Sequence, residues 1–224
     1  MDTASGAAKE GNLVIKAIIF DMDGVLVDAK QWHFEALNQA LELFGYRISQ
    51  FDHHKRFDGL PTRKKLEILA EEEGFPASLS SFVNEMKQHY LLETAEQLCK
   101  PNPVHLQTLE QLRKEGYQLA LASNSIRRSV DKLMRLTELQ ELLSFTLSNE
   151  DVERPKPSPE IYRLAIEKLG MEPHECLVVE DGEYGLAAAK AAGANLLRVE
   201  TVHDVNFANV KKRLGELGTQ VAAA

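Results

Sequence analysis

The sequence lacks several features that define whole classes of protein. No apolar run approaches the roughly 20 residues of a membrane-spanning helix, so we expect no transmembrane segment. The only two cysteines, Cys99 and Cys176, form no CxxC or zinc spacing and are too few for a disulfide framework, so we expect a reducing, cytoplasmic location. No basic block offsets the formal net charge of −8, which argues against nucleic acid and anionic membranes as partners.

What is present is ordinary for a globular protein. The 224 residues, 44% hydrophobic and 27% charged, suffice for one large domain or a core with a smaller attachment. Residues 1–11 lack the apolar centre of a signal peptide and, like the closing QVAAA, are expected to form a loose end. We expect a monomer or a weak dimer.

Five short β-branched or apolar segments have the length of strands. They are residues 14–20, 117–123, 144–148, 175–181 and 194–200. Helix-like stretches at 126–136, 159–169 and 183–192 alternate with the last four of them. This alternation predicts the α/β class, with a Rossmann-like parallel sheet covered by helices on both faces.

Residues 29 to 100 break this alternation. They contain three helix-like segments, at 31–44, 62–73 and 79–98, and end at the stiff segment KPNP. We therefore predict two domains: an α/β core of residues 12–28 and 101–218, and a small helical cap of residues 29–100 inserted after the first strand. A cleft is expected between them.

Polar residues follow the predicted strands at the edge where ligands of open α/β sheets bind. They are Asp21 and Asp23, then Ser123 and Asn124, then Lys156 in the segment RPKPSP, then Glu180 and Asp181. Acids from separate strands suit Mg²⁺, which prefers a few carboxylates together with substrate phosphate. Lys156 and Ser123 are then the groups expected to face the phosphate. Of the two neighbouring acids, one can attack while the other holds a proton for the leaving group.

The segments DMDGV, SNS, RPKPSPEIY and VVEDGEYGLAAAKAAG, in this order, resemble the four motifs of the haloacid dehalogenase superfamily. The helical insert resembles the small cap of its β-phosphoglucomutase-like phosphatase group. The resemblance spans about residues 14 to 200. One departure is Gly182, because a serine often follows the acidic pair in these enzymes.

The resemblance implies a role for each motif residue. Asp21 matches the nucleophile that forms an aspartyl-phosphate, and Asp23 matches the general acid/base that also lends its backbone carbonyl to Mg²⁺. Ser123 and Lys156 match the groups that bind the transferring phosphoryl, and Asn124 either joins them or shapes the loop. The implied metal residues are Asp21, Asp23, Glu180 and Asp181, with Asp181 the preferred direct ligand.

The cap is expected to select the substrate. The segment FDGLPTRKKL resembles the specificity loop of these caps and favours Arg63 as a substrate contact, and His33 is either a site histidine or a surface one. His53, His54 and Arg56 are further cap residues expected at the cleft. Such groups suit a polar substrate, sugar-like or bearing a second anion.

We therefore predict a Mg²⁺-dependent phosphomonoester hydrolase that acts on a small phosphorylated metabolite, with a sugar phosphate preferred. One alternative is a β-phosphoglucomutase-type mutase. His33 fits this alternative, whereas Ala29 argues against it, because those mutases look to carry a hydroxyl residue at this position. A dehalogenase is disfavoured by Asp23 and the acidic pair. A non-catalytic binding module is disfavoured because the nucleophile, the lysine and the metal acids are all present.

Overall fold

The computed structural model describes residues 15–57 and 59–220, without the side chains of residues 54, 219 and 220. The expected leader at 1–11, position 12 and residues 221–224 lie outside this part of the chain. Cys99 and Cys176 are both buried free thiols. Within the described part, no helix combines the length and apolar character needed to cross a membrane.

The core is a five-stranded parallel sheet in the order β3-β2-β1-β4-β5. The strands are β1 (Ala17–Phe20), β2 (Gln118–Ala122), β3 (Phe145–Leu147), β4 (Cys176–Glu180) and β5 (Asn195–Arg198). In the central strand, Ile19 pairs with Ala120 on one side and Val178 on the other. The prediction of a parallel sheet is confirmed, and each strand lies within its predicted segment.

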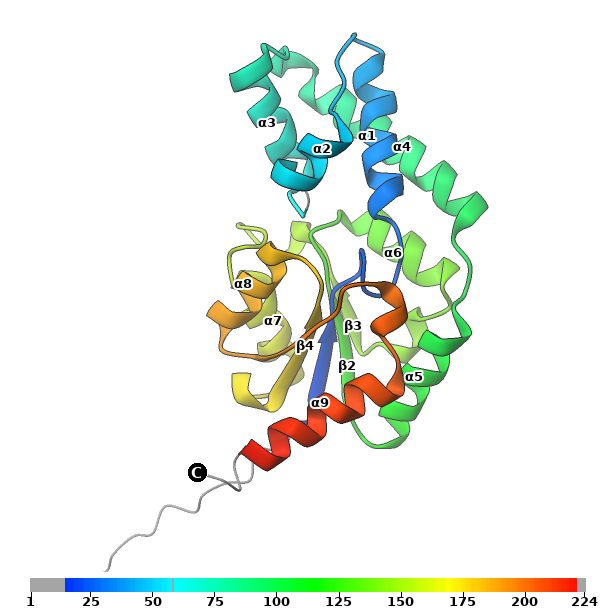
Figure 1. Cartoon of the computed structure of the whole chain (residues 1–224), viewed down its shortest axis with the longest axis vertical. Helices are drawn as coiled ribbons and strands as arrows, with labels where there is room; N and C mark the ends of the chain where they lie inside the picture. The colour runs from blue at the N-terminus through cyan, green and yellow to red at the C-terminus, as the bar shows by residue number, and fades with distance from the viewer. Residues whose placement is uncertain (1–14, 58, 221–224) are drawn as a thin grey trace, which may run out of the picture.

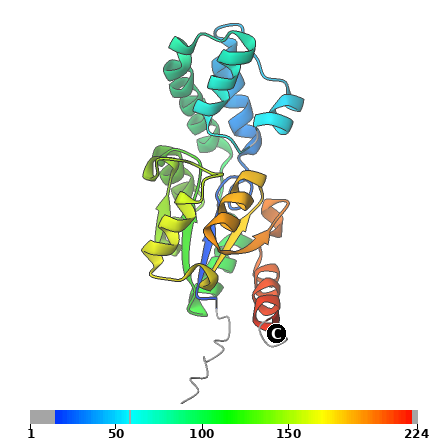
Figure 2. The same cartoon turned by 90° about the vertical axis from the view of Figure 1, so that its left-hand side faces the viewer.

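Helices cover both faces of the sheet. They are α5 (Pro103–Lys114), α6 (Arg127–Leu136), α7 (Glu160–Leu169), α8 (Glu183–Ala192) and α9 (Phe207–Gln220). Because successive strand residues point to opposite faces, Ile18 and Phe20 pack with α5, α6 and α9, whereas Ala17 and Ile19 pack with α7 and α8. The resulting layers lie below the remaining helices in Figures 1 and 2.

The inserted helices form a second body beyond the carboxyl ends of the strands (Figure 1). They are α1 (Lys30–Glu42), α2 (Gln50–Asp52), the π-helical turn η1 (His53–Phe57), α3 (Thr62–Glu73) and α4 (Ser80–Leu98). Leu37, Leu66 and Val83 belong to a hydrophobic cluster of their own, separate from the two clusters beside the sheet. The last turn of α4 differs, because Ala95 packs in a core cluster. These clusters support the predicted cap, although its boundaries at 29 and 100 stay predictions.

Short 3-10 turns complete the fold. They are η2 (Ala77–Leu79), η3 (Gln140–Leu142), η4 (Asn149–Asp151), η5 (Pro173–Glu175) and η6 (Val202–Asp204).

The sequence patterns did not predict α5 or α9, nor the helical turns at 50–57. At the start of α5, the same residues are typical both of a connector and of the beginning of a helix. The side chain of Asn102 caps the helix by accepting a hydrogen bond from the Val104 N–H at 2.9 Å, and Pro103 occupies the first turn. The segment KPNP is therefore both a linker and the beginning of a helix.

Candidate active site

All nine predicted site residues line one cavity of about 710 Å³ between the sheet and the cap helices. They are Asp21, Asp23, His33, Arg63, Ser123, Asn124, Lys156, Glu180 and Asp181. A cavity of this volume can hold a small organic ligand.

Asp21 begins the loop after β1 and is held there because its N–H donates to the Val179 carbonyl at 3.0 Å. Its carboxylate accepts a hydrogen bond from Lys156 Nζ at 2.7 Å. Burial raises the pKa of Asp21 well above its usual value, and the charges of Glu180, Asp181 and Asp23 raise it further against the opposing effect of Lys156. The ionised form of Asp21 thus depends on added positive charge.

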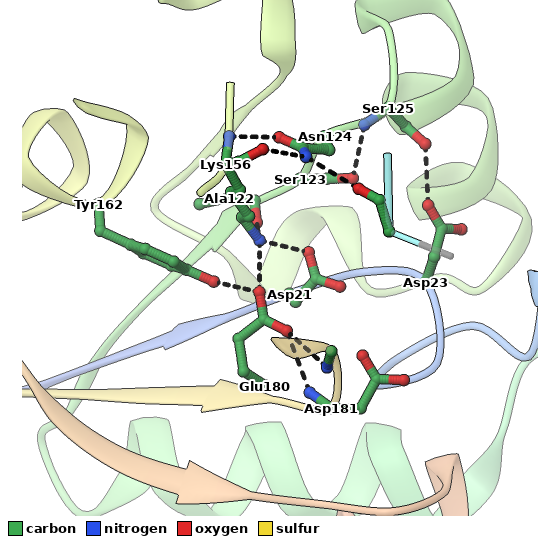
Figure 3. Close-up of polar contacts among 12 residues, drawn as sticks. Asp21, Asp23, Ala122, Ser123, Asn124, Ser125, Lys156, Tyr162, Glu180 and Asp181 are labelled. Carbon is green, nitrogen blue, oxygen red and sulfur yellow. Dashed lines mark hydrogen bonds and ion pairs between the residues drawn. The ribbon is translucent and has the colours of Figure 1, made fainter. Parts of the chain in front are cut away.

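Lys156 joins two of the acids. Its ammonium donates to Asp21 Oδ1 at 2.7 Å, to Glu180 Oε1 at 2.7 Å and to the Ala122 carbonyl at 2.8 Å (Figure 3). Burial opposes the charge, but Asp21 and Glu180 outweigh it and leave the pKa of Lys156 above its ordinary value. The lysine therefore stays a fixed cation at the base of the cavity.

Both carboxylate oxygens of Glu180 are engaged. Oε1 accepts hydrogen bonds from Lys156 and from the Tyr162 hydroxyl at 2.6 Å, and Oε2 accepts from the N–H groups of Asp181 at 3.0 Å and Gly182 at 3.3 Å. A Cβ atom at Gly185 would overlap this carboxylate, so a glycine is needed there. These contacts fix the orientation of Glu180 and, through it, of Lys156. A direct metal role for Glu180 stays a prediction.

Asp23 lies in a tight turn after Asp21. Gly24 follows it with a φ of +88°, and a Cβ atom at this glycine would overlap Asp181 Oδ2. One oxygen of Asp23 accepts a hydrogen bond from Ser125 Oγ at 2.8 Å, and the other lies 3.2 Å from His33 Nε2. Burial opposes ionisation, yet His33 and Ser125 outweigh it and hold the pKa of Asp23 below its usual value. The two neighbouring acids therefore have pKa shifts in opposite directions, with that of Asp21 raised and that of Asp23 lowered.

The loop after β2 carries three polar residues with different surroundings. Ser123 is buried, and its Oγ accepts a hydrogen bond from the Ser125 N–H at 3.0 Å. The Asn124 amide accepts from the Lys156 N–H at 3.0 Å and donates to the Gly59 carbonyl at 3.2 Å. Asn124 thus connects two core loops with the cap. Its role as a phosphate ligand remains a prediction.

Three acids form a group that could hold a cation. Asp21, Glu180 and Asp181 each offer a carboxylate oxygen, and these atoms lie within 4.8 Å of one another. Carboxylate oxygens are ligands that Mg²⁺ prefers, and the charges of Glu180 and Asp181 add to the effect of burial in raising the pKa of Asp21. Asp181 Oδ2 also forms an ion pair with Lys30 Nζ at 2.5 Å. The residues therefore fit a hard divalent cation.

The two cap residues singled out by the sequence have different positions. His33 reaches the core and contacts Asp23, and its Nδ1 lies 2.8 Å from Lys87 Nζ. Burial and Lys87 lower the pKa of His33, which favours the neutral ring. Arg63 lies at the rim with its side chain 90% exposed and paired with Glu67, so its substrate contact stays a prediction. The side chain of His54 lies outside the described part of the structure.

Sequence patterns missed several polar residues in and around this cavity, four of which hold or flank the predicted groups. Ser125 and Tyr162 orient Asp23 and Glu180, and Lys65 and Lys87 lie buried on its cap side. Ser125 closes the quoted segment SNS and Tyr162 closes RPKPSPEIY, so their proximity to the motifs was the available signal. Nothing in the helical patterns distinguished the two lysines from surface ones.

Fold and site together define a class of capped α/β enzymes, in which strand-end acids, a lysine and a serine meet beneath a helical insert. The sequence model of the haloacid dehalogenase-like hydrolase family matches residues 18–199. A phosphorylated carbohydrates phosphatase of Thermotoga maritima is 35% identical over 86% of this chain and 88% of its own length.

Solved structures agree with this match. A putative β-phosphoglucomutase from Thermotoga maritima is 32% identical, with a TM-score of 0.64 over 91% of this chain and 92% of its own. A β-phosphoglucomutase from Clostridium difficile, at 19% identity, shares the fold, with a TM-score of 0.78 over 91% of this chain and 98% of its own. The chain belongs to the haloacid dehalogenase-like hydrolase family, in its β-phosphoglucomutase-like group of phosphatases.

Proposed function

We propose that this protein is a Mg²⁺-dependent phosphomonoester hydrolase that works through an aspartyl-phosphate on Asp21. The observation that carries the proposal is the contact of Lys156 with Asp21, in a cavity shared with Asp23, Ser123 and Asp181. The family match and the name of the Thermotoga maritima relative support a phosphorylated carbohydrate as the substrate class. We further propose that it acts in the cytoplasm as a monomer or weak dimer.

The residues divide the reaction between them. The ionised Asp21 attacks phosphorus and the bond from phosphorus to the ester oxygen breaks. Asp23, which must enter this step carrying a proton, donates that proton to the departing alcohol. Asp23, again ionised, then takes a proton from water as that water attacks the aspartyl-phosphate, which releases inorganic phosphate and restores Asp21. Lys156 and Ser123 counter the charge of the transferring phosphoryl group. Mg²⁺, held by Asp21, Asp181 and the Asp23 carbonyl with Glu180 beside them, would supply further positive charge there.

The contact between His33 and Asp23 also favours a second candidate, a sugar phosphate mutase. In that reaction the phosphoryl group on Asp21 passes to another hydroxyl of a sugar instead of to water. His33 Nε2 lies 3.2 Å from Asp23 Oδ1, and such an imidazole beside the acid suits proton exchange with a second sugar hydroxyl. Ala29 argues for the hydrolase, because the mutases look to carry a hydroxyl residue at this position and alanine offers none.

A phosphatase screen over phosphorylated metabolites with Mg²⁺ tests the proposal, and released phosphate is the readout. We expect hydrolysis that disappears in Asp21→Asn and on chelation of the metal. Assays for isomerised sugar phosphate, with and without a bisphosphate primer, separate the mutase. Persistent activity in Asp21→Asn protein of wild-type purity would contradict the assignment of the nucleophile, and no turnover under any condition would favour a binding module.

A further inference from the structure

Two lysines pair with the acidic group formed by Asp21, Glu180 and Asp181, and they are held in different ways. Lys156 donates three hydrogen bonds from a side chain that is only 3% exposed. Lys30 forms an ion pair with Asp181 at 2.5 Å, and its side chain is 37% exposed. An ammonium that reaches water can be hydrated when it leaves its partner, whereas a buried one cannot. Lys30 is therefore the lysine of the two that can leave the acids at low cost.

The ion pair of Lys30 joins the cap to the core. Lys30 is the first residue of α1, whereas Asp181 follows β4. Both side chains lie against the turn at Gly24, where a Cβ atom would come within 2.6 Å of Lys30 Cε and 1.9 Å of Asp181 Oδ2. The contact is thus packed on the turn that carries Asp23, beside the acids and not at the outer rim of the cavity.

Asp181 requires a positive partner at this position. Its side chain is 5% exposed, and removing a carboxylate from water is unfavourable unless an opposite charge accompanies it. Lys30 supplies such a charge, and a divalent cation held by the acidic group would supply one as well. Two cations that share one carboxylate repel each other at short range. The ammonium of Lys30 therefore opposes the binding of a metal ion to Asp181.

We propose that Lys30 is a displaceable counter-ion of Asp181, which a divalent metal ion drives off the carboxylate when it binds. The inference rests on the proposed function, in which Mg²⁺ binds at Asp181, and it adds a cap residue to the determinants of metal affinity. The effect is reciprocal, because the metal weakens the contact between Lys30 and Asp181 by the factor by which that contact weakens metal binding. Metal affinity in the core is thereby linked to the first turn of α1.

Calorimetric titration of the whole chain with Mg²⁺ tests this inference without turnover. Lys30→Met keeps the length and apolar stem of the side chain but removes its charge, so we expect Mg²⁺ to bind about fivefold to twentyfold more tightly than to wild type. Lys30→Arg keeps the charge and should stay within about twofold of wild type. Lys55→Met is the matched control, because Lys55 is an exposed cation that lines the same cavity and lies over the ring of Phe51. It removes the same charge but leaves the pair at Asp181, so its affinity should change by less than about twofold.

Thermal unfolding gives a second readout that a merely structural role would not move. In the presence of a chelator, Lys30→Met should melt below wild type, because Asp181 loses this partner. Added Mg²⁺ should then raise the melting temperature of Lys30→Met by more than it raises that of wild type or of Lys55→Met. If Lys30 only supported the fold, Mg²⁺ would raise all three melting temperatures equally, and the inference would be overturned.

The outcomes separate this inference from the proposed function. Equal or weaker Mg²⁺ binding by Lys30→Met would overturn the counter-ion role, and so would an equal gain in Lys55→Met, which would show a general effect of charge. Either result leaves the proposed function standing if the wild-type protein hydrolyses phosphomonoesters with Mg²⁺. Tighter binding by Lys30→Met without any hydrolysis by the wild-type protein would support the inference and contradict the proposed function. No effect of Mg²⁺ on any of these proteins would contradict both.

Discussion

Tyr162 contributes a single hydroxyl group to the site. It donates to Glu180 Oε1 from a fully buried position, and burial together with Glu180 keeps its pKa well above the usual value, so the hydroxyl remains a donor. Tyr162→Phe should lower kcat by about threefold to tenfold with little change in KM, because Glu180 then holds Lys156 less firmly. We also expect a loss of about 1 kcal/mol of stability. Steady-state kinetics and urea unfolding measure both, and an unchanged kcat would contradict the positioning role.

Lys87 makes stability depend on pH. Its pKa is about 7 in the folded protein and near the ordinary 10.5 when unfolded, so between these values the unfolded chain binds more protons. The free energy of unfolding should therefore rise with pH through that window, because the folded protein keeps Lys87 largely neutral and the cost of removing its proton on folding falls as pH rises. Lys87→Met should be more stable than wild type by about 1 kcal/mol or more at pH 7, and the difference should shrink toward pH 10.

Urea unfolding at several pH values checks this prediction. Lys64→Met serves as the control, because Lys64 is exposed and its loss should add no such slope. A Lys87→Met protein that is less stable than wild type throughout the window would contradict the lowered pKa of Lys87. The same variant should lose activity, since His33 then lacks its lysine partner.

Residue by residue, the sequence predicted the acids and Lys156 but not the hydrogen-bonded groups that orient them. The acids follow strands, and the period and ends of strands are visible as apolar runs. Ser125 and Asp23 are 102 positions apart, so their contact follows only from the arrangement of β1 beside β2. The burial of Lys87 likewise depends on how the cap helices pack.

At the scale of elements, the first turn of α8 must pass very close to the end of β4. Glu180 ends the strand, and Gly185 leaves the volume that its carboxylate occupies. Gly185→Ala should displace Glu180, lower kcat by about tenfold or more and destabilise the fold by about 1–3 kcal/mol. Gly182→Ala is the matched control, because no atom lies within 4 Å of the Cβ position there. Thermal unfolding and kinetics of both variants measure the difference, and equal behaviour would contradict the close approach.

Elements with strong periodicity were predicted within a few residues, whereas α5 and α9 were not. The cap of α5 consists of Asn102 and Pro103, residue types that also make turns. The sequence pattern predicted the length of α4 but not that its side chains pack against both the cap and the core. Its Gln88 accepts a buried hydrogen bond from Ser129 of α6 at 2.9 Å, and Ala95 packs with the core. Which side chains of α4 contact the core depends on where the cap and the core meet.

At the scale of the whole molecule, Asn124 makes one of the polar contacts through which cap and core meet. Its amide joins the Gly59 carbonyl of the cap to the backbone of Lys156. Asn124→Ala should raise KM by about threefold to tenfold and increase amide exchange at residues 59–62, because the loop loses this link. Hydrogen exchange by mass spectrometry measures the second effect. Unchanged exchange in this loop would show that other contacts hold it.

The placement of His33 on α1 and of Asp23 in the core ties the general acid of the proposed reaction to the cap. Under the proposed function, a cap that moved away would carry the imidazole with it and leave Asp23 with its bond to Ser125. Asp23 would then have both partners only while the cap covers the cavity. We therefore expect the acceptor, water or a sugar hydroxyl, to be the one enclosed when the cap is closed.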